Sequence, residues 1–315
     1  MLFEQIARNR RHTIWLLIFM AIIVLAVGLV FAWAFGTDWM WIFWLASFGY
    51  LAWFYWHSAT VLMKINGGRQ IDEKSAPRLY ELVTELCLAS GLPMPKIYIL
   101  PIDCPNAFAT GCNPEHASLA VTQGLLDLMN DEELRGVLGH ELSHIKNYDI
   151  RVTTIAMSLL ELVRYSGWGL LIAGIGLMSV KTRAGIIKLI FLMIGASLAV
   201  VGGIIAIVGI PLARIAFFAI SREREYLADA GSVEMTRDPS GLISALEKLK
   251  SDERQMPVDD AATNAICFNA RPGNWLMKLF DTHPPLEKRI ERLKESASSK
   301  YRIRKTIALL KNSSS

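Results

Sequence analysis

The chain has 315 residues, 52% of them hydrophobic and only 20% charged, and its mean hydropathy is positive. This composition is too apolar for one soluble domain of that length and favours a membrane protein that carries folded soluble parts. The net charge is +4, but the last twenty residues alone hold five basic and no acidic side chains, so the nearly neutral remainder argues against a nucleic-acid binder.

Two uncharged apolar runs open the chain, at residues 13–35 and 39–56, with a short turn between them. At about 1.5 Å per helical residue each run can cross a hydrocarbon core of roughly 30 Å, the second only just. Tryptophan and tyrosine gather at both ends of the second run, as they do at membrane interfaces. A cleavable signal peptide is disfavoured because the first run is too long and the second follows too soon. Residues 1–63 are therefore predicted to form a retained transmembrane hairpin.

Charges around this hairpin predict its orientation. Basic residues flank it on both sides, namely Arg8, Arg10, Arg11, Lys64 and Arg69. The tip between the two runs carries only Asp38. Because basic flanks tend to stay inside, both ends of the hairpin are expected in the cytoplasm, and residues 64–150 are expected to begin a cytoplasmic domain.

Residues 151–220 contain a second pair of apolar runs, at 165–180 and 189–213. The longer run is predicted to span the membrane. The shorter one makes only about 24 Å of helix, so it crosses only if Arg164 snorkels or Glu161 enters the membrane. A hairpin that lies partly in the interface is the alternative.

Residues 221–295 are again soluble in composition and form the second part of the predicted cytoplasmic domain. Three segments show helical patterns, namely SREREYLADAGS, residues 239–250 and DTHPPLEKRIERL. Together with residues 64–150 they are long enough to build one core if the two parts pack together. The basic tail at 296–315 is expected to be disordered, with binding to anionic lipid as the alternative.

The segment GHELSHIKNYD, at 139–149, contains the pattern HExxH. An acidic helix start at 130–133 and apolar residues at helical spacing predict that this segment is a helix. On a helix His140 and His144 lie one turn apart on one face, so both imidazoles can bind one metal ion. Two idle histidines on a solvated helix are the disfavoured alternative. The predicted ion is a single catalytic zinc.

A catalytic zinc usually takes three protein ligands. Asn147 and Ile150 stand where the pattern HExxHxxGxxH needs glycine and histidine, so that completion is excluded. A glutamate from another helix is the other common third ligand. Glu225 is the best candidate because Asp229, four residues later, can hold a ligand imidazole, whereas Glu223 has an apolar residue there. Donors without such a partner also remain open, namely His116, Glu133, Asp149 and Glu161.

The chemistry expected of such a site is peptide hydrolysis without a covalent intermediate. Glu141 follows the first histidine and is predicted to be the general base that takes a proton from the attacking water and passes it to the leaving amine. Zinc would lower the pKa of that water and polarise the scissile carbonyl.

Several segments together resemble the HtpX family of membrane zinc proteases, which are heat-shock-linked relatives of the CaaX prenyl endopeptidases. They are GHELSHIKNYDIR, PNAFATG, VTQGLL, SREREYLADAGS and THPPLEKRIERL, and the similarity runs from the opening MLFEQIARNRR to about residue 295. The resemblance implies a mainly α integral membrane protein, with four transmembrane helices and an α+β zincin-like cytoplasmic protease domain that has a small sheet. It assigns one zinc ion to His140, His144 and Glu225, and catalysis to Glu141.

The family further implies a multi-pass protein of the cell (inner or plasma) membrane whose active site and termini are cytoplasmic. Its expected substrates are misfolded or damaged membrane proteins, in quality control and the stress response, and its expected partners are these proteins and the lipid bilayer. In related zinc proteases an edge strand pairs with the substrate backbone. That role would fall on Asn106, Ala107, Phe108, Ala109 and Thr110. His283 is either an oxyanion donor or a structural residue.

Three rival interpretations can be weighed on the sequence. A zinc-dependent membrane sensor without turnover would be expected to lack the base, and Glu141 is present. A transporter would need polar residues deep in its spans, yet besides glycine and proline residues 189–213 offer only Ser197. Among proteases, a CaaX prenyl endopeptidase is the runner-up, and four apolar runs in 315 residues favour the HtpX type.

Overall fold

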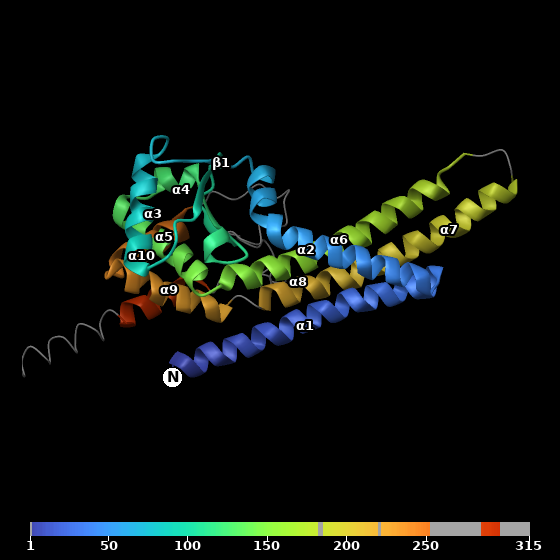
Figure 1. The fold of residues 1–315 in the computed structure, drawn as a ribbon, viewed down its shortest axis with the longest axis horizontal. Coiled ribbons are helices and arrows are strands. Elements are labelled where there is room, and N and C mark those ends of the chain that lie inside the picture. The colour runs from blue at the N-terminus through green and yellow to red at the C-terminus, as the bar shows by residue number, and fades with distance from the viewer. Residues whose placement is uncertain (1, 182–184, 220–221, 253–284, 297–315) are drawn as a thin grey trace, which may run out of the picture. The chain divides into compact units, whose positions relative to one another are not determined.

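The computed structural model describes residues 2–181, 185–219, 222–252 and 285–296 (Figure 1). The chain divides into two compact units. The first, which we name the helical unit, comprises residues 1–58 and 152–220. The second, which we name the α/β unit, comprises residues 59–151 and 221–315. Each unit is therefore built from two separate stretches of the chain.

Long helices account for the described part of the helical unit. They are α1 (Leu2–Phe35), α2 (Thr37–Ile65), α6 (Asp149–Met178), α7 (Gly185–Ile204), the π-helical turn η2 (Ile205–Gly209) and α8 (Ile210–Ala219). The helices α2 and α6 continue into the α/β unit. The π-helical turn lies just before Pro211, whose ring nitrogen cannot donate a backbone hydrogen bond, so a local change of helix geometry is expected there.

Two helices in the described ranges are long and apolar enough to cross a membrane, Asp149–Met178 and Gly185–Arg214, and Leu17–Trp33 is a shorter apolar helix. Residues 165–178 of the run at 165–180, which looks too short from its own length, are thus the end of a 30-residue helix, Asp149–Met178. Four transmembrane helices remain a prediction, since only these two meet the criteria for a span.

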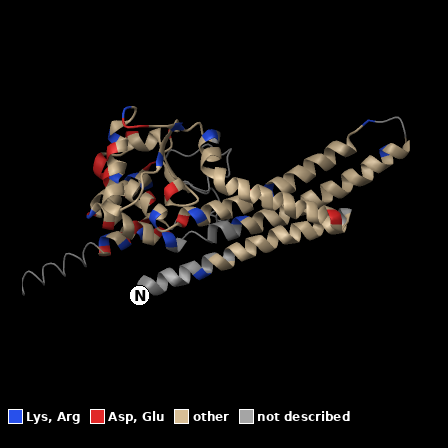
Figure 2. Cartoon of the chain, in the orientation of Figure 1, with Lys and Arg blue, Asp and Glu red and all other residues tan. Residues whose placement is uncertain are grey.

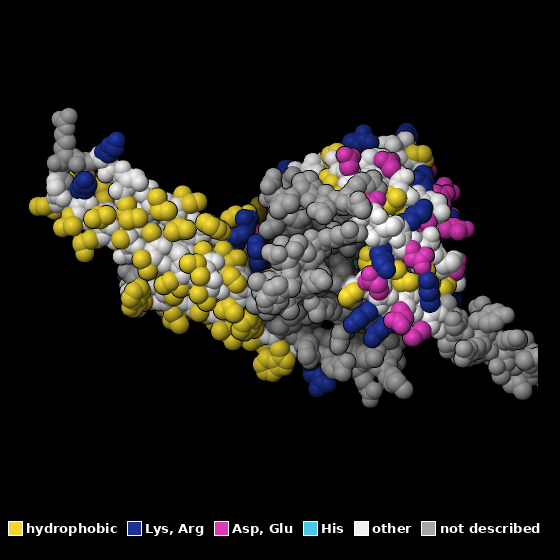
Figure 3. All heavy atoms as spheres, turned by 180° about the vertical axis from the view of Figure 1, so that it is seen from behind, with side chains coloured by type: hydrophobic (Ala, Val, Ile, Leu, Met, Phe, Trp, Pro, Cys, Tyr) yellow, Lys and Arg dark blue, Asp and Glu magenta, His cyan; other side chains and the backbone are white. Residues whose placement is uncertain are grey.

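Charge and hydrophobicity differ between the two units. Charged residues are frequent in the α/β unit and sparse along the long helices (Figure 2). Hydrophobic side chains cover much of the visible face of the helical unit (Figure 3). Many large apolar side chains of this unit are exposed, for example Trp33 at 78%, Ile186 at 78% and Ile207 at 76%. An exposed apolar surface of this kind is unfavourable in water and suits contact with lipid.

The α/β unit combines a four-stranded sheet with short helices. The strands are β1 (Arg69–Gln70), β2 (Lys96–Leu100), β3 (Ala107–Gly111) and β4 (Ala117–Thr122), in the order β1-β2-β4-β3. Strands β2 and β4 are parallel, and the other two pairs are antiparallel. The helices are α3 (Pro77–Ser90), α4 (Gln123–Leu128), α5 (Asp131–Lys146), α9 (Arg222–Thr236), α10 (Ser240–Ser251) and a further one at 286–296, with a 3-10 turn η1 (Pro114–His116). The prediction of a mainly helical protein with a small sheet is confirmed.

The core of this unit forms around α5, which packs against α3, α9, α10 and strand β3. Its apolar side chains are almost fully buried, among them Leu134, Leu138 and Leu142. Glycine lets the neighbouring backbones approach, because a Cβ atom on Gly136 would lie 2.6 Å from the backbone nitrogen of Leu242. The helix that carries HExxH is therefore the central element of the unit, held on several sides.

Residues at the start of α5 anchor it to α10. Asn130 and Glu133 form a capping box, in which each side chain accepts a hydrogen bond from the other residue's backbone N–H. The Glu133 carboxylate, only 3% exposed, also accepts hydrogen bonds from Ser244 Oγ at 2.6 Å and Lys248 Nζ at 2.7 Å. Glu133, one of the alternative zinc ligands, thus has a structural role.

Candidate metal centre

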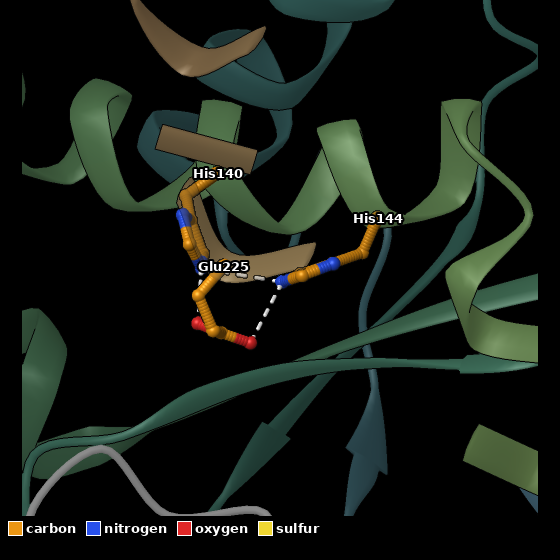
Figure 4. A group of neighbouring side chains, drawn as sticks. All are labelled: His140, His144 and Glu225. Atoms are coloured by element: carbon orange, nitrogen blue, oxygen red, sulfur yellow. Dashed lines mark hydrogen bonds and ion pairs between the residues drawn. The ribbon is translucent and has the colours of Figure 1, made fainter. Parts of the chain in front are cut away.

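Three potential ligands converge where α5 meets α9. His140 and His144 project from α5 toward Glu225 of α9 (Figure 4). The two Nε2 atoms are 3.2 Å apart, and they lie 3.3 and 3.6 Å from the carboxylate oxygens of Glu225. One ligand atom from each residue lies within 4.8 Å of the others, close enough to hold one metal ion.

Helix packing explains why these residues meet. The histidines share a face of α5 because they are four residues apart, and that face lies against α9. The two helices approach closely at Ser232, whose hydroxyl donates a hydrogen bond to the backbone carbonyl of Gly136 at 2.7 Å. Gly139 leaves room there, since an added Cβ would be 3.0 Å from that hydroxyl.

Each imidazole contacts a carboxylate through its other nitrogen. His140 Nδ1 lies 2.9 Å from Asp229 Oδ1, and His144 Nδ1 lies 3.0 Å from Asp149 Oδ2. An N–H on Nδ1 that donates to a carboxylate leaves the lone pair of Nε2 facing Glu225, which is the tautomer a metal ligand needs. Asp229 lies where the i+4 argument expected it. Asp149, considered from the sequence as a ligand, instead holds His144.

Arg289, in the helix at 286–296, lies behind the first of these pairs and is fully buried. Its Nε and Nη2 donate to the two oxygens of Asp229 at 2.9 and 2.5 Å, and its Nη1 is 3.8 Å from Glu225 Oε2. Burial alone would raise the pKa of Asp229, but Arg289 and His140 outweigh it and hold that pKa at about 2. Arg289 is not among the residues predicted for the site from the sequence. The only signal for it was a basic residue inside the apolar stripe of this helix, between Leu286 and Ile290.

A second buried arginine lies behind the other pair. Arg224 Nη1 is 3.7 Å from Asp149 Oδ1, longer than a hydrogen bond but close enough for an ion pair. Both imidazole–carboxylate pairs of the centre therefore have a buried arginine beside their carboxylate. The two aspartates are not held equally, because Asp229 accepts two hydrogen bonds from Arg289 whereas the contact of Asp149 with Arg224 is a longer ion pair.

The charges of the centre fit a divalent cation. Four carboxylates are buried here, namely those of Glu141, Asp149, Glu225 and Asp229, against two guanidinium groups, those of Arg224 and Arg289. With neutral imidazoles the cluster carries a net charge of about −2, which a dication would balance. The pKa of His140 also indicates that the surrounding carboxylates favour a positive charge here. Burial and Arg289 lower it, but hydrogen bonds to Asp229 and Glu225 raise it to about 9. Two imidazoles and a carboxylate are a donor set that suits zinc.

The residues predicted for catalysis and substrate binding lie as follows. Glu141 is 4% exposed and adjoins His140 on α5. Residues 107–110 form most of β3, which lies at one end of the sheet order, pairs with β4 as its only partner among the described strands, and packs against α5. Asn106 precedes this strand, and its backbone is bonded to Thr122. His283 lies outside the described residues.

The remaining alternative ligands are engaged elsewhere. His116 is exposed and contacts Asn113 Oδ1 through its Nδ1 at 2.8 Å. Glu161 is buried on α6 and accepts hydrogen bonds from Arg164 at 2.7 and 2.5 Å. Neither belongs to the cluster formed by His140, His144 and Glu225.

Known proteins with related sequences were compared with the chain. The profile of peptidase family M48 matches residues 73–297. A "Protease HtpX homolog" of Streptococcus gordonii is 43% identical over 306 residues, which cover 94% of this chain and all of the relative. One of Streptococcus pneumoniae is 41% identical over 304 residues, with the same coverage. Among solved structures, Ste24p of S. mikatae matches 87% of this chain with 20% identity and a TM-score of 0.43, and the match spans 62% of that protein.

Proposed function

The chain belongs to peptidase family M48 and, within it, to the HtpX proteases, and from that premise we propose that it is a zinc-dependent membrane endopeptidase which cleaves misfolded or damaged membrane proteins. The observation that carries this proposal is the convergence of His140, His144 and Glu225 beside the buried carboxylate of Glu141. A sensor or a scaffold would need the ligands but not this acid.

The residues of the centre have distinct tasks in peptide hydrolysis. His140, His144 and Glu225 would hold a zinc ion, which when bound activates water and polarises the scissile carbonyl. Glu141 accepts the proton of the attacking water and delivers it to the leaving amine. Asp229 and Asp149 orient the two imidazoles through their Nδ1 atoms.

Substrate binding is assigned to the edge strand β3. An extended peptide that adds to this edge would be held by backbone hydrogen bonds, which tolerate many sequences. Such pairing suits an enzyme that acts on varied unfolded proteins. The side chains of Ala107, Phe108 and Thr110 are buried, so we assign binding here to the backbone.

The membrane location rests on the helical unit. Helices Asp149–Met178 and Gly185–Arg214 meet the length and hydropathy of a span, and the exposed apolar side chains of α1 and α2 suit lipid as well. Basic residues at the outer ends of both hairpins favour the cytoplasm for the termini and for the active site. The proposed arrangement is a multi-pass protein of the cell membrane with four helical spans.

Proteolysis by the full-length protein in detergent tests the proposal. We expect casein and an unfolded membrane protein to be cleaved, cleavage to stop when the metal is stripped, and zinc to restore it. The variant Glu141→Gln should keep stoichiometric zinc but lose about 10²–10⁴-fold in turnover, because the ligands are intact and the base is gone.

The matched control is Glu132→Gln, the same change at an exposed position of the same helix, and its turnover should equal that of the wild type. Near-normal turnover by Glu141→Gln would remove the base from the mechanism. Full activity without metal would reject the proposed enzyme class.

A further inference from the structure

A fully buried arginine is unusual because removing its charge from water is costly unless the charge is well paired. Arg289 is 0% exposed. It donates hydrogen bonds to Asp229, 60 residues away along the chain, and its Nη2 lies 3.2 Å from Nδ1 of His140, 149 residues away. The fold therefore brings a C-terminal cation to the rear of the metal centre. The geometry of its contacts indicates its role there.

The guanidinium of Arg289 fixes both oxygens of one carboxylate. Its Nε and Nη2 donate to Oδ2 and Oδ1 of Asp229, the two-point geometry that a planar guanidinium makes with a carboxylate. The Oδ1 atom also faces His140 Nδ1 at 2.9 Å. Arginine only donates hydrogen bonds, so it favours ionised Asp229 as the acceptor for the Nδ1–H group, and the His140 Nε2 lone pair is left toward Glu225.

The orientation of His140 by Arg289 and Asp229 favours metal binding, whereas the positive charge of Arg289 by itself disfavours it. A positive guanidinium near a cation site repels the cation, and Arg289 Nη1 is 3.8 Å from Glu225 Oε2, the carboxylate of a proposed ligand. If repulsion dominated, removing Arg289 would strengthen metal binding. If orientation of Asp229 and His140 dominates, removing it weakens metal binding. The two effects differ in sign and can be separated by one measurement.

The helix that bears Arg289 is also part of the core. Ile290 and Leu293 on it are 8% and 4% exposed and belong to the main hydrophobic cluster. Arg292 lies over the ring of Tyr226, a residue of α9, with 3.8 Å from its Cζ to the ring centroid. The helix at 286–296 thus docks on the helix that carries Glu225 while it delivers Arg289 to the centre.

We propose that Arg289 is a positioning residue of the metal centre, which acts through Asp229 on His140 and so links docking of the helix at 286–296 to metal affinity. This inference rests on the proposed function only in that the centre binds zinc. Metal binding stabilises the positions of His140, Asp229 and Arg289 that it requires, so zinc should also stabilise the docking of the helix at 286–296 on α9.

Zinc affinity of the full-length protein, measured by chelator competition in detergent, tests this role. We expect Arg289→Met to weaken zinc binding by about 10–100-fold, which is the usual effect of removing a residue that orients a metal ligand. Arg289→Lys, which keeps the charge but not the two-point geometry, should fall between this variant and the wild type. The visible spectrum of the cobalt-substituted protein should change in Arg289→Met, since ligand orientation changes. Lys288→Met, at an exposed position of the same helix, is the control and should stay within about threefold of the wild type.

A double-mutant cycle shows whether Arg289 acts through Asp229. In an Asp229→Asn background, adding Arg289→Met should change zinc affinity little, because the partner of the arginine is already gone. This double variant also removes both buried charges together, so it keeps a fold even where the single variant leaves Asp229 unpaired and unfolds.

Two outcomes would overturn the inference. One is zinc binding by Arg289→Met that equals or exceeds that of the wild type, and the other is full additivity of the two substitutions. A wild-type protein that binds no zinc would instead reject the proposed function, so the two failures can be told apart.

Discussion

The two histidines of the centre are alike in sequence but differ in their surroundings. The His140 side chain is 0% exposed and contacts Asp229, which two hydrogen bonds from Arg289 hold in place. The His144 side chain is 14% exposed, and Asp149 beside it is 12% exposed. Solvent screens and partly replaces interactions at the second position, so the first carboxylate should matter more for metal binding.

Asparagine in place of each aspartate measures this difference. We expect Asp229→Asn to weaken zinc binding by about 10–100-fold and Asp149→Asn to weaken it by less, because Asp229 is the more deeply buried of the two and accepts hydrogen bonds from Arg289 at both oxygens. Chelator competition on the purified full-length variants gives the two affinities. A larger loss of zinc affinity in Asp149→Asn than in Asp229→Asn would mean that burial does not determine how much these contacts contribute to zinc binding.

At the scale of the element, the N-terminus of α5 depends on one buried carboxylate. Burial raises the pKa of Glu133, but hydrogen bonds from Lys248, Ser244 and the Asn130 backbone outweigh it and bring the pKa below its ordinary value of 4.5. A carboxyl with a depressed pKa stabilises the fold above its unfolded pKa, and this stabilisation is lost as the pH falls through the folded value.

Glu133→Gln keeps the shape of the side chain and removes its charge. We expect the variant to lose about 1–2 kcal/mol of stability near neutral pH, since hydrogen bonds to a charged acceptor become neutral ones. The difference from the wild type should shrink as the pH falls below 4.5, because Glu133 is protonated first in the unfolded chain and, at lower pH, in the folded protein as well. Thermal unfolding in detergent over this pH range measures it, with Glu132→Gln as control. A difference that does not depend on pH would contradict the role of the charge.

The packing of α6 on α7 depends on glycine at one position and not at a nearby one. A Cβ atom on Gly174 would lie 2.4 Å from the backbone nitrogen of Ala199 and 2.5 Å from the carbonyl oxygen of Gly195, whereas one on Gly176 would meet nothing within 4 Å. Small residues of this kind let helices approach closely in a membrane.

Alanine at each glycine provides a matched pair. Gly174→Ala should destabilise the protein by about 1–3 kcal/mol because the two backbones must separate. Gly176→Ala should be neutral or slightly stabilising, because alanine favours a helix. The midpoints of thermal unfolding in detergent compare the two variants. Equal effects would show that α6 and α7 are not packed in this way.

At the scale of the whole molecule, the metal centre constrains the path of the chain through the membrane. His140 and His144 precede α6 and α7, and Glu225 follows them. Residues that bind one ion must lie on the same side of a membrane, so the two apolar helices either both cross it or both fail to cross. A single crossing would separate Glu225 from the histidines.

Cysteine labelling in intact cells tests this constraint. In a cysteine-free background, we expect Gln70→Cys, Asn147→Cys and Ser240→Cys to react only with reagent that reaches the cytoplasm, because these exposed positions flank the helices in the α/β unit. Lys181→Cys, beyond α6, should react from outside if both helices cross. Opposite labelling of positions 147 and 240 in an active, zinc-loaded protein would rule out a shared site.

Sequence periodicity alone predicted several features that depend on neighbours along the chain. The pitch of an α-helix predicts the helix with HExxH, the helices near residues 225 and 245, and the position of Asp229 one turn after Glu225. Continuous apolar segments predict the long helices. The helices appear at these positions in the structure, although most of the run at 165–180 belongs to a longer helix that begins at Asp149. Local geometry is the same in every protein, so such features can be predicted without knowing the fold.

Only the tertiary structure decided which groups from other elements hold the ligands and the helix that carries them. Arg289 meets Asp229 across 60 residues, Lys248 reaches Glu133 across 115, and Asp149 holds His144 just past the end of α5 instead of competing as a ligand. The order of the strands, with β3 at one end, could not be predicted from the sequence either. These contacts depend on how helices and strands pack, and no repeat along the sequence encodes that packing, because the free energy that selects it comes from the burial of the whole core.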